Sequence, residues 1–165
     1  MMTMRKPLWV PSEECQKQAN ITSFIGLVNE KYDISLSSYR QLYDWSIRST
    51  PDFWAVMWEF GGIRASSCYD VVVDDLKKFP GACWFAGARM NFAENLLRYS
   101  SDRTALIFKR EMQEPTKVTY SELQDSVARL AAALRQIGVA GDDRVAAYMP
   151  NLPETVIAML ATTSI

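Results

Sequence analysis

The sequence predicts an α/β fold in which a helical N-terminal segment precedes the first strands and helices of a larger domain. Three observations lead to this prediction. Apolar residues recur at helical spacing before residue 100, short runs rich in β-branched and aromatic residues begin after residue 101, and further helical patterns follow those runs. Because alternating strands and helices are typical of α/β domains, we expect two regions, residues 1–100 and residues 101–165.

Helical periodicity is clearest near the start of the first region. Ile21, Phe24, Ile25 and Val28 lie at positions i, i+3, i+4 and i+7, which share one face of an α-helix. A helix with an apolar face buries that face against other elements, so these residues are expected to contribute to a core.

Local signals predict where further helices of this region begin and end. Ser38 and Gln41 have the spacing of a capping box. Thr50 is expected to be an N-cap, followed by Pro51 at the first helical position, where its missing N–H costs nothing. The glycines at 61 and 62 are expected to end that helix.

The first region also contains all five tryptophans. An aromatic stripe can stack on a ligand ring, but at helical spacing it more often packs in a core or interface, where large aromatic side chains dominate burial. We therefore interpret the tryptophans as packing residues. They are Trp9, Trp45, Trp54, Trp58 and Trp84.

Residues 84–99, WFAGARMNFAENLLRY, combine aromatic, amide and charged side chains in one short run. We interpret Trp84 and Phe85 as packing residues, and Asn91 with Glu94 as a variant of the capping box. The two leucines that follow would form the buried face of the capped helix. The stretch is expected to be a junction between the two regions and not a catalytic site.

The second region opens with a predicted hairpin. Residues 104–108 and 117–120 predict two strands, and the polar residues between them predict a turn. Ser121 and Gln124 have capping-box spacing at the start of a long amphipathic helix, which Gly138 is expected to end. The expected apolar face comprises Leu123, Val127, Leu130, Ala131, Leu134 and Ile137.

Another strand and a helix are predicted towards residue 165. Residues 144–149 (RVAAYM) predict a strand, and Asn151 and Glu154 fit a capping box around Pro153. Apolar strands that alternate with helices suggest the opening of a parallel sheet. The final apolar helix has no glycine stop and no following strand, so the chain is expected to end within an incomplete domain.

Composition narrows the classes of function. A net charge of −1 gives no electrostatic reason to expect nucleic acid or an anionic membrane as a partner. The sequence has no apolar run of signal-peptide or membrane-helix length, so we expect a cytoplasmic protein. It contains no histidine, which removes Ser-His-Asp and Cys-His catalysis and histidine-ligated zinc.

Neither the cysteines nor any short motif indicates a catalytic, metal-binding or phosphate-binding site. Cys15, Cys68 and Cys83 are far apart and form no C-x-x-C pair, so buried or incidental thiols in a reducing compartment are expected. No phosphate-binding glycine loop and no G-x-S-x-G elbow is present. The adjacent carboxylates at 13–14, 74–75 and 142–143 point to different sides of an element, which makes them poor acid–base pairs.

Residues 118–162 resemble the entry into the large domain of adenylate-forming enzymes, the superfamily of acyl-CoA synthetases and luciferases. The shared pattern is T-Y-x-E-L, a helix that ends in G-V, a Gly-Asp pair before a strand, and M-P-N-x-P-E. The matching residues are Thr119, Tyr120, Glu122, Leu123, Gly138, Val139, Gly141, Asp142, Val145, Pro150, Asn151, Pro153 and Glu154.

The first region is similar to the N-terminal segment of the acetyl-CoA synthetase branch of that superfamily. The similarity lies in YRQLYDWSIRSTPDFWAVMWEF and WFAGARMNFAENLL. The ending NFAENLL, with Y-x-x-L-Y-x-W-S upstream, is more similar to branch members that act on acetoacetate than to those that act on acetate or propionate. Residues 1–100 therefore resemble the N-terminal helical segment of this branch, and residues 101–165 the start of its AMP-binding domain.

The resemblance implies an acetoacetate–CoA ligase with two half-reactions, and it implies ATP, CoA and Mg²⁺ as cofactors of the full-length enzyme. The acetoacetate carboxylate attacks ATP to give an acyl-adenylate and pyrophosphate. The CoA thiol then displaces AMP, and Mg²⁺ would neutralise phosphate charge. The family's phosphate loop, acyl pocket and catalytic lysine have no counterpart in this sequence. The resemblance therefore assigns no catalytic, cofactor-binding or metal-binding residue, and we expect the chain alone to be inactive.

Two alternatives stay open. The chain could be part of an acetyl- or propionyl-CoA synthetase, because the family's acyl pocket lies outside it. It could also be a truncated, non-catalytic interaction module, since the exposed apolar face of an unfinished sheet favours association.

Overall fold

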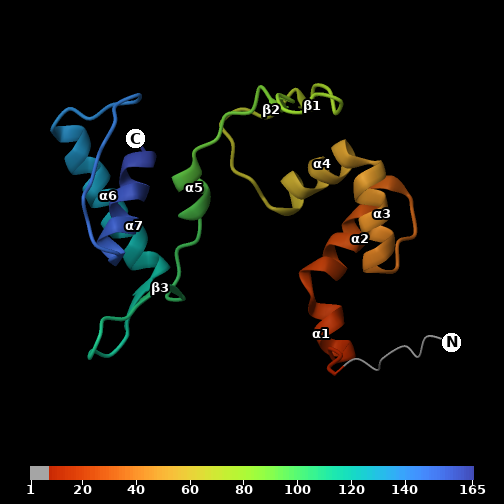
Figure 1. The fold of residues 1–165 in the computed structure, drawn as a ribbon, viewed down its shortest axis with the longest axis horizontal. Helices are drawn as coiled ribbons and strands as arrows, with labels where there is room; N and C mark the ends of the chain where they lie inside the picture. The colour runs from red at the N-terminus through yellow and green to blue at the C-terminus, as the bar shows by residue number, and fades with distance from the viewer. Residues whose placement is uncertain (1–7) are drawn as a thin grey trace. The chain divides into compact units, whose positions relative to one another are not determined.

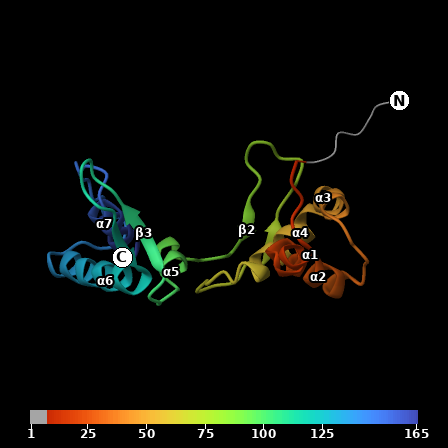
Figure 2. The same ribbon diagram turned by 90° about the horizontal axis from the view of Figure 1, so that it is seen from below.

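The computed structural model describes residues 8–165, which form two units (Figures 1 and 2). The first unit comprises the described residues up to Ile63 together with Val71–Ala86. The second unit comprises Arg64–Asp70 and Gly87–Ile165. Each unit has a hydrophobic core of its own.

The first unit consists of helices followed by a short hairpin (Figure 1). Its core contains Phe24 and Val28, so the helix predicted around residues 21–28 is confirmed, whereas Ile21 is exposed. The other two buried residues of this core are Leu42 and Val56, which lie in the next two long helices. The elements are α1 (Glu13–Gln18), α2 (Asn20–Tyr32), α3 (Tyr39–Arg48), α4 (Thr50–Phe60), β1 (Val71–Val73) and β2 (Trp84–Ala86).

Aromatic rings surround the core of the first unit in edge-to-face contacts, a geometry that the ring quadrupole favours. Phe53 on α4 contacts Phe24 on α2 at a centroid distance of 5.7 Å and Trp45 on α3 at 6.4 Å. Trp54 likewise contacts Trp84 on β2 at 6.1 Å. The packing role is confirmed for Trp45, which packs against the core. Trp54 and Trp84 contact each other but are each 41% exposed, and Trp9 is exposed as well.

The predicted start of α3 at Ser38 is confirmed, although the reciprocal bond of the capping box is not, and the predicted start of α4 needs correction. Ser38 caps α3 by accepting from the Gln41 backbone N–H at 3.3 Å, but the Gln41 side chain accepts from the backbone of Ser37 and not of Ser38. The N-cap of α4 is Ser49, and Thr50 is already helical. Pro51 tolerates this shift because the N–H groups of the whole first helical turn lack intrahelical partners.

The predicted end of α4 is confirmed. Gly62 has a φ of 56°, a left-handed conformation that glycine adopts without a Cβ penalty. Its backbone N–H donates to the Glu59 carbonyl at 2.9 Å, which satisfies a carbonyl of the last turn. The chain then leaves the helix at Ile63.

The second unit contains a hairpin and three helices that pack around small and aliphatic side chains (Figure 1). Its core comprises Ala93, Leu123, Val127, Ala131, Leu160 and Ala161. The elements are α5 (Phe92–Leu96), β3 (Thr104–Phe108), β4 (Thr116–Thr119), α6 (Tyr120–Gln136) and α7 (Pro153–Thr163).

The hairpin of the second unit is confirmed as an antiparallel pair in which Leu106 lies opposite Val118. The capping box of α6 lies two residues before the predicted one. Thr119 accepts from the Glu122 backbone N–H at 3.2 Å, and the Glu122 carboxylate accepts from the Thr119 N–H at 2.8 Å. Thr119 has the extended backbone that an N-cap requires because it ends β4.

The apolar face of α6 is confirmed at Leu123, Val127 and Ala131, which are buried. Ile137 was expected on this face but is exposed, because it lies at the C-cap, where the helix ends. Gly138 follows with a φ of 100°, as expected for a helix stop.

Two predictions after residue 140 are wrong. Residues 144–149 form no strand and are exposed, and the two described sheets are the antiparallel pairs β1–β2 and β3–β4. A strand is defined by its partner, and none of the described segments pairs with this one. The N-cap of α7 is Leu152 with no side-chain cap bond, so Asn151 does not cap that helix.

No helix in the described part of the chain is long and apolar enough to cross a membrane.

Candidate functional site

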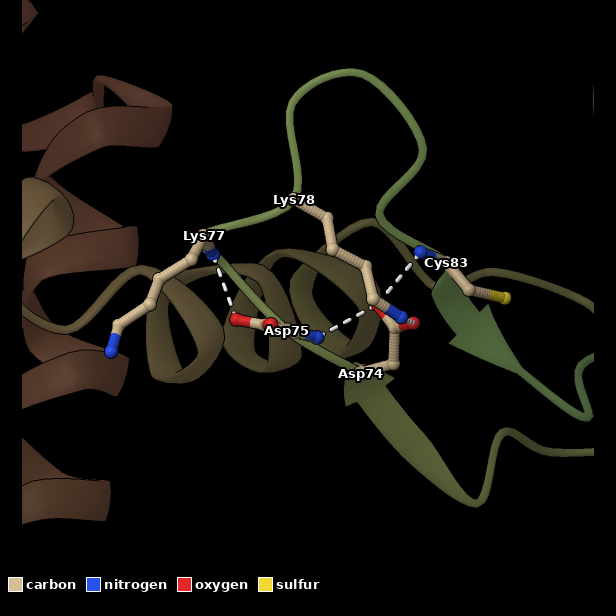
Figure 3. A network of polar contacts seen from close by, with 5 residues as sticks. All are labelled: Asp74, Asp75, Lys77, Lys78 and Cys83. Carbon is tan, nitrogen blue, oxygen red and sulfur yellow. Dashed lines mark hydrogen bonds and ion pairs between the residues drawn. The ribbon is translucent and has the colours of Figure 1, made fainter.

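The turn between β1 and β2 holds a compact network of polar contacts in the first unit (Figure 3). The Asp74 carboxylate directly follows β1 and accepts from the Lys78 ammonium. It also accepts from the backbone N–H of Asp75 at 2.7 Å and of Cys83 at 2.9 Å. The Asp75 carboxylate has a different partner, the backbone N–H of Lys77 at 2.8 Å.

These contacts explain the acidity of Asp74. The hydrogen bond from Lys78 and then the one from the Cys83 backbone lower the pKa of Asp74 from 3.8 to about 2. The same contact raises the pKa of Lys78 above its ordinary value. Asp74 is therefore an ionised anchor at neutral pH and not a proton donor. Figure 3 shows the Cys83 thiol turned away from this carboxylate.

A second polar feature is an open cleft of about 660 Å³ in the second unit, lined by the β3–β4 hairpin, α6 and the start of α7. Arg110, Lys117 and Arg129 line it together with acidic residues of the same elements. None of its charged side chains appears in an ion pair within 4.0 Å among residues 8–165. The acidic residues are Glu114, Glu122, Asp125 and Glu154.

The best-defined carboxylate of this cleft, Glu122, has a structural role. Hydrogen bonds from the Thr119 backbone N–H and then from the Thr119 hydroxyl lower its pKa. Ser126 lies beside Arg129, whose Nη2 donates to the serine hydroxyl at 3.3 Å. The cleft thus presents mixed charge to solvent, and the described residues bring no nucleophile and general base together in it.

Metal ligation has no candidate in the part of the chain that the structure describes, where no three His, Cys, Asp or Glu side chains gather. The three cysteines are free and exposed. Of the two alternatives expected for them, buried or incidental thiols, the first is therefore wrong.

Residues 84–99 have structural roles in both units. Asn91 caps α5 by accepting from the Glu94 backbone N–H at 3.0 Å, and its side-chain nitrogen donates to the Thr163 carbonyl of α7 at 2.9 Å. The buried residue of α5 is Ala93. Of the two leucines predicted to be buried, Leu97 is partly buried against the core, whereas Leu96 is exposed.

Sequence reasoning missed the role of Asn95. Its side chain accepts from the Arg64 backbone N–H at 2.9 Å and donates to the Arg64 carbonyl at 2.8 Å. These bonds tie α5 to a segment 31 residues away in the sequence. No local spacing rule relates two positions so far apart, and only the amide side chain itself could have suggested such a link.

Comparison with known proteins identifies the family of this chain. The model of the acetyl-coenzyme A synthetase N-terminus matches residues 39–96, and the AMP-binding enzyme model matches residues 92–165. The acetoacetyl-CoA synthetase of Xenopus tropicalis is 43% identical over 97% of this chain, and that of Rattus norvegicus is 45% identical over 96%. The chain belongs to the acetyl-CoA synthetase-like branch of the AMP-binding enzymes.

A solved structure of the same branch supports the fold. Acetoacetyl-CoA synthetase from Streptomyces lividans is similar with a TM-score of 0.84 at 40% identity, over 96% of this chain. The chain covers 25% of that structure and 24% of the length of both relatives. It corresponds to the N-terminal region of these AMP-binding enzymes, as the sequence predicted.

Proposed function

We propose that this chain forms the N-terminal part of an ATP-dependent acetoacetate–CoA ligase. The observation that carries the proposal is identity of 40–45% to acetoacetyl-CoA synthetases over nearly the whole chain, together with the TM-score of 0.84. A likeness at this level extends through both units and both family models.

The proposed reaction has two half-reactions. The acetoacetate carboxylate attacks the α-phosphate of ATP to form acetoacetyl-AMP and release pyrophosphate, and the CoA thiol then attacks the acyl carbon and expels AMP. Mg²⁺ would neutralise phosphate charge in the first step. We propose that residues 8–165 support the catalytic parts of the enzyme, because the resemblance assigns no reacting group of either step to them.

The division of the chain belongs to the same proposal. We assign residues 1–100 to the N-terminal segment and residues 101–165 to the start of the AMP-binding domain. The change of sequence character near residue 100 supports this boundary, and the two family models meet close to it. A cytoplasmic location is also proposed, because three exposed free cysteines suit a reducing compartment.

Reading the DNA downstream of the Ile165 codon and expressing the protein it encodes tests the proposal. We expect a Ser/Thr/Gly-rich loop that ends in lysine, and ATP–pyrophosphate exchange that depends on acetoacetate more than on acetate or propionate. The 165-residue chain alone is the control and should show no exchange. Exchange by that chain, or a full-length product that prefers acetate, would contradict the corresponding part of the proposal.

A further inference from the structure

Two tryptophan side chains of the first unit lie outside its core and meet at an open cavity. Trp54 of α4 and Trp84 of β2 are each 41% exposed, and neither belongs to the buried core of this unit. Together with Phe85 they line a cavity of about 390 Å³, and no other side chain among residues 8–165 lines it. Large aromatic rings are usually buried or placed at interfaces, so a cavity walled by three of them is a candidate binding site.

The backbone at Phe85 brings the third ring to this cavity. Successive side chains of a strand point to opposite faces, so Trp84 and Phe85 of β2 would normally lie on opposite sides. Phe85 has a φ of 50°, a left-handed conformation that bulky residues rarely adopt, and this breaks the alternation. Trp58 of α4 packs on the Phe85 ring at a centroid distance of 4.8 Å. Such strain persists where surrounding contacts hold it, and it is concentrated at binding sites.

The angle between the two indole rings selects the shape of the ligand. The ring centroids of Trp54 and Trp84 are 6.1 Å apart, and the angle between the ring planes is 69°. A flat group such as adenine or guanidinium can stack on only one of two rings at this angle. A rounded trimethylammonium group can face both rings at once, and the negative ring faces attract its positive charge.

The chemistry of the cavity wall selects quaternary over primary ammonium groups. None of the lining residues carries a charge or a carboxylate. A primary ammonium group is strongly hydrated and needs hydrogen-bond acceptors when it leaves water. A quaternary ammonium group has no N–H to leave unsatisfied, so aromatic rings alone can bind it. The cavity therefore suits a ligand of opposite charge to acetoacetate, ATP and CoA, the reactants of the proposed function.

We propose that Trp54, Trp84 and Phe85 form an aromatic cage that binds a quaternary ammonium head group. The cage is held in shape before the ligand binds. Phe53 contacts the Trp54 ring edge to face at 5.3 Å, and Trp58 supports Phe85. Rings that are already ordered lose little conformational freedom on binding, which favours affinity.

Choline and neohexanol provide the test, because neohexanol has the shape of choline with carbon in place of the charged nitrogen. Titration of the 165-residue chain, followed by proton NMR, should shift the choline methyl signal upfield, as expected for protons above ring faces. The dissociation constant should be roughly tenfold lower for choline than for neohexanol. Equal affinities would overturn the proposal, because the cavity would then be merely apolar.

A peptide that carries trimethyllysine presents the same head group from a second source. Binding of choline or of this peptide supports the cage, and the tighter ligand identifies the source. Binding of neither overturns the proposal.

Substitutions locate the binding. Trp54→Leu keeps an apolar side chain but removes the ring, so it should weaken choline binding roughly tenfold and change neohexanol binding little. Trp54→Phe restores a ring and should recover much of the affinity. Trp9→Leu is the matched control, since Trp9 is exposed and does not line the cavity. Equal effects of the two leucine substitutions on choline binding would overturn the proposal. Circular dichroism checks that each variant is folded, and Trp84→Leu repeats the test from β2.

The protein encoded by the complete reading frame should bind choline as well. Binding by the 165-residue chain alone would mean that the rest of the protein covers the cavity, and it would overturn the proposal. Pyrophosphate exchange that depends on acetoacetate is measured on the same protein. Exchange without choline binding contradicts only the cage, and choline binding without exchange contradicts only the proposed function.

Discussion

In the first unit, aromatic rings close a small core between α2, α3 and α4, whereas in the second unit alanine and aliphatic side chains let α6 and α7 pack closely. No ring belongs to the buried core of the second unit. Each large ring buries much apolar area, so a few of them complete a core within about sixty residues. Small side chains stabilise less per residue and depend on close neighbours.

The two units also differ in what lies beside their cores. The first unit surrounds its core with rings from its own helices. The second unit leaves residues 144–149 exposed beside α7. All five tryptophans belong to the first unit, so tryptophan fluorescence follows its unfolding while circular dichroism follows both units.

The largest expected effect is that of Phe24→Ala in the first unit. Phe24 is 4% exposed and contacts Phe53 and Phe60 edge to face. Removing a buried phenylalanine ring leaves a cavity and costs about 3–5 kcal/mol. Chemical denaturation followed by tryptophan fluorescence should show this loss. Phe79→Ala is the matched control, because that ring is 97% exposed, and an equal loss there would contradict the assignment of the core.

Leu160→Ala tests the second unit. Leu160 is buried in the core between α6 and α7, and truncating such a leucine costs about 2–5 kcal/mol. The circular dichroism transition of the second unit should move to lower denaturant concentration while the fluorescence transition stays in place. Leu96→Ala, at an exposed leucine of the same unit, is the control. Movement of both transitions would show that the units unfold together, and it would contradict the description of two units with independent cores.

The extent to which the sequence predicts this fold follows from the range of each interaction. Helices with a clear period, the β3–β4 hairpin and the glycine stops depend on neighbours within a few residues, and these predictions are confirmed. The N-cap of α4 and the capping box of α6 were displaced because neighbouring serines and threonines fit the same pattern. The end of β4 at Thr119 decides between them for α6.

Features that depend on distant partners were not predictable. A strand at 144–149 requires a second strand that no local pattern specifies. The polar cleft unites Arg110 with Glu154, which lie in different elements far apart in the sequence. The contact between Asp74 and Lys78 was predictable from the sequence, since the two residues are four positions apart. The contact with the Cys83 backbone was not, because only the folded hairpin brings it to the same carboxylate.

Asn91→Ala has a smaller expected effect, about 1–2 kcal/mol, in the second unit. The substitution removes the N-cap of α5 and also the bond to Thr163 of α7, so the cost should exceed that of an ordinary cap. Thermal unfolding by circular dichroism measures it. Asn151→Ala is the matched control, because Asn151 was predicted to cap α7 and does not. If the two substitutions cost the same, the sequence pattern would be right and the observed caps wrong.

The smallest expected effect is the pH dependence of the β1–β2 turn in the first unit. The pKa of Asp74 is lowered to about 2 in the folded state from 3.8, so its contribution to stability is fully present above pH 3.8. That contribution is lost as the pH falls from 3.8 towards 2. The pKa of Lys78 is raised above 10.5, so its contribution is present below pH 10.5 and is lost at higher pH.

Carbon-detected NMR titration of the Asp74 carboxyl measures this directly. The midpoint should lie near pH 2 in the native chain and should rise in Lys78→Met, because the hydrogen bond from Lys78 is the main cause of the lowered pKa. It should stay below 3.8 in that variant, since the backbone N–H of Cys83 still donates to the carboxylate. Lys77→Met is the matched control, because only the backbone of Lys77 contacts the turn, through Asp75. A midpoint of 3.8 in the native chain would mean that the turn does not hold Asp74 in solution. The hairpin would then depend on β1–β2 pairing and on the ring contacts of Trp84 alone.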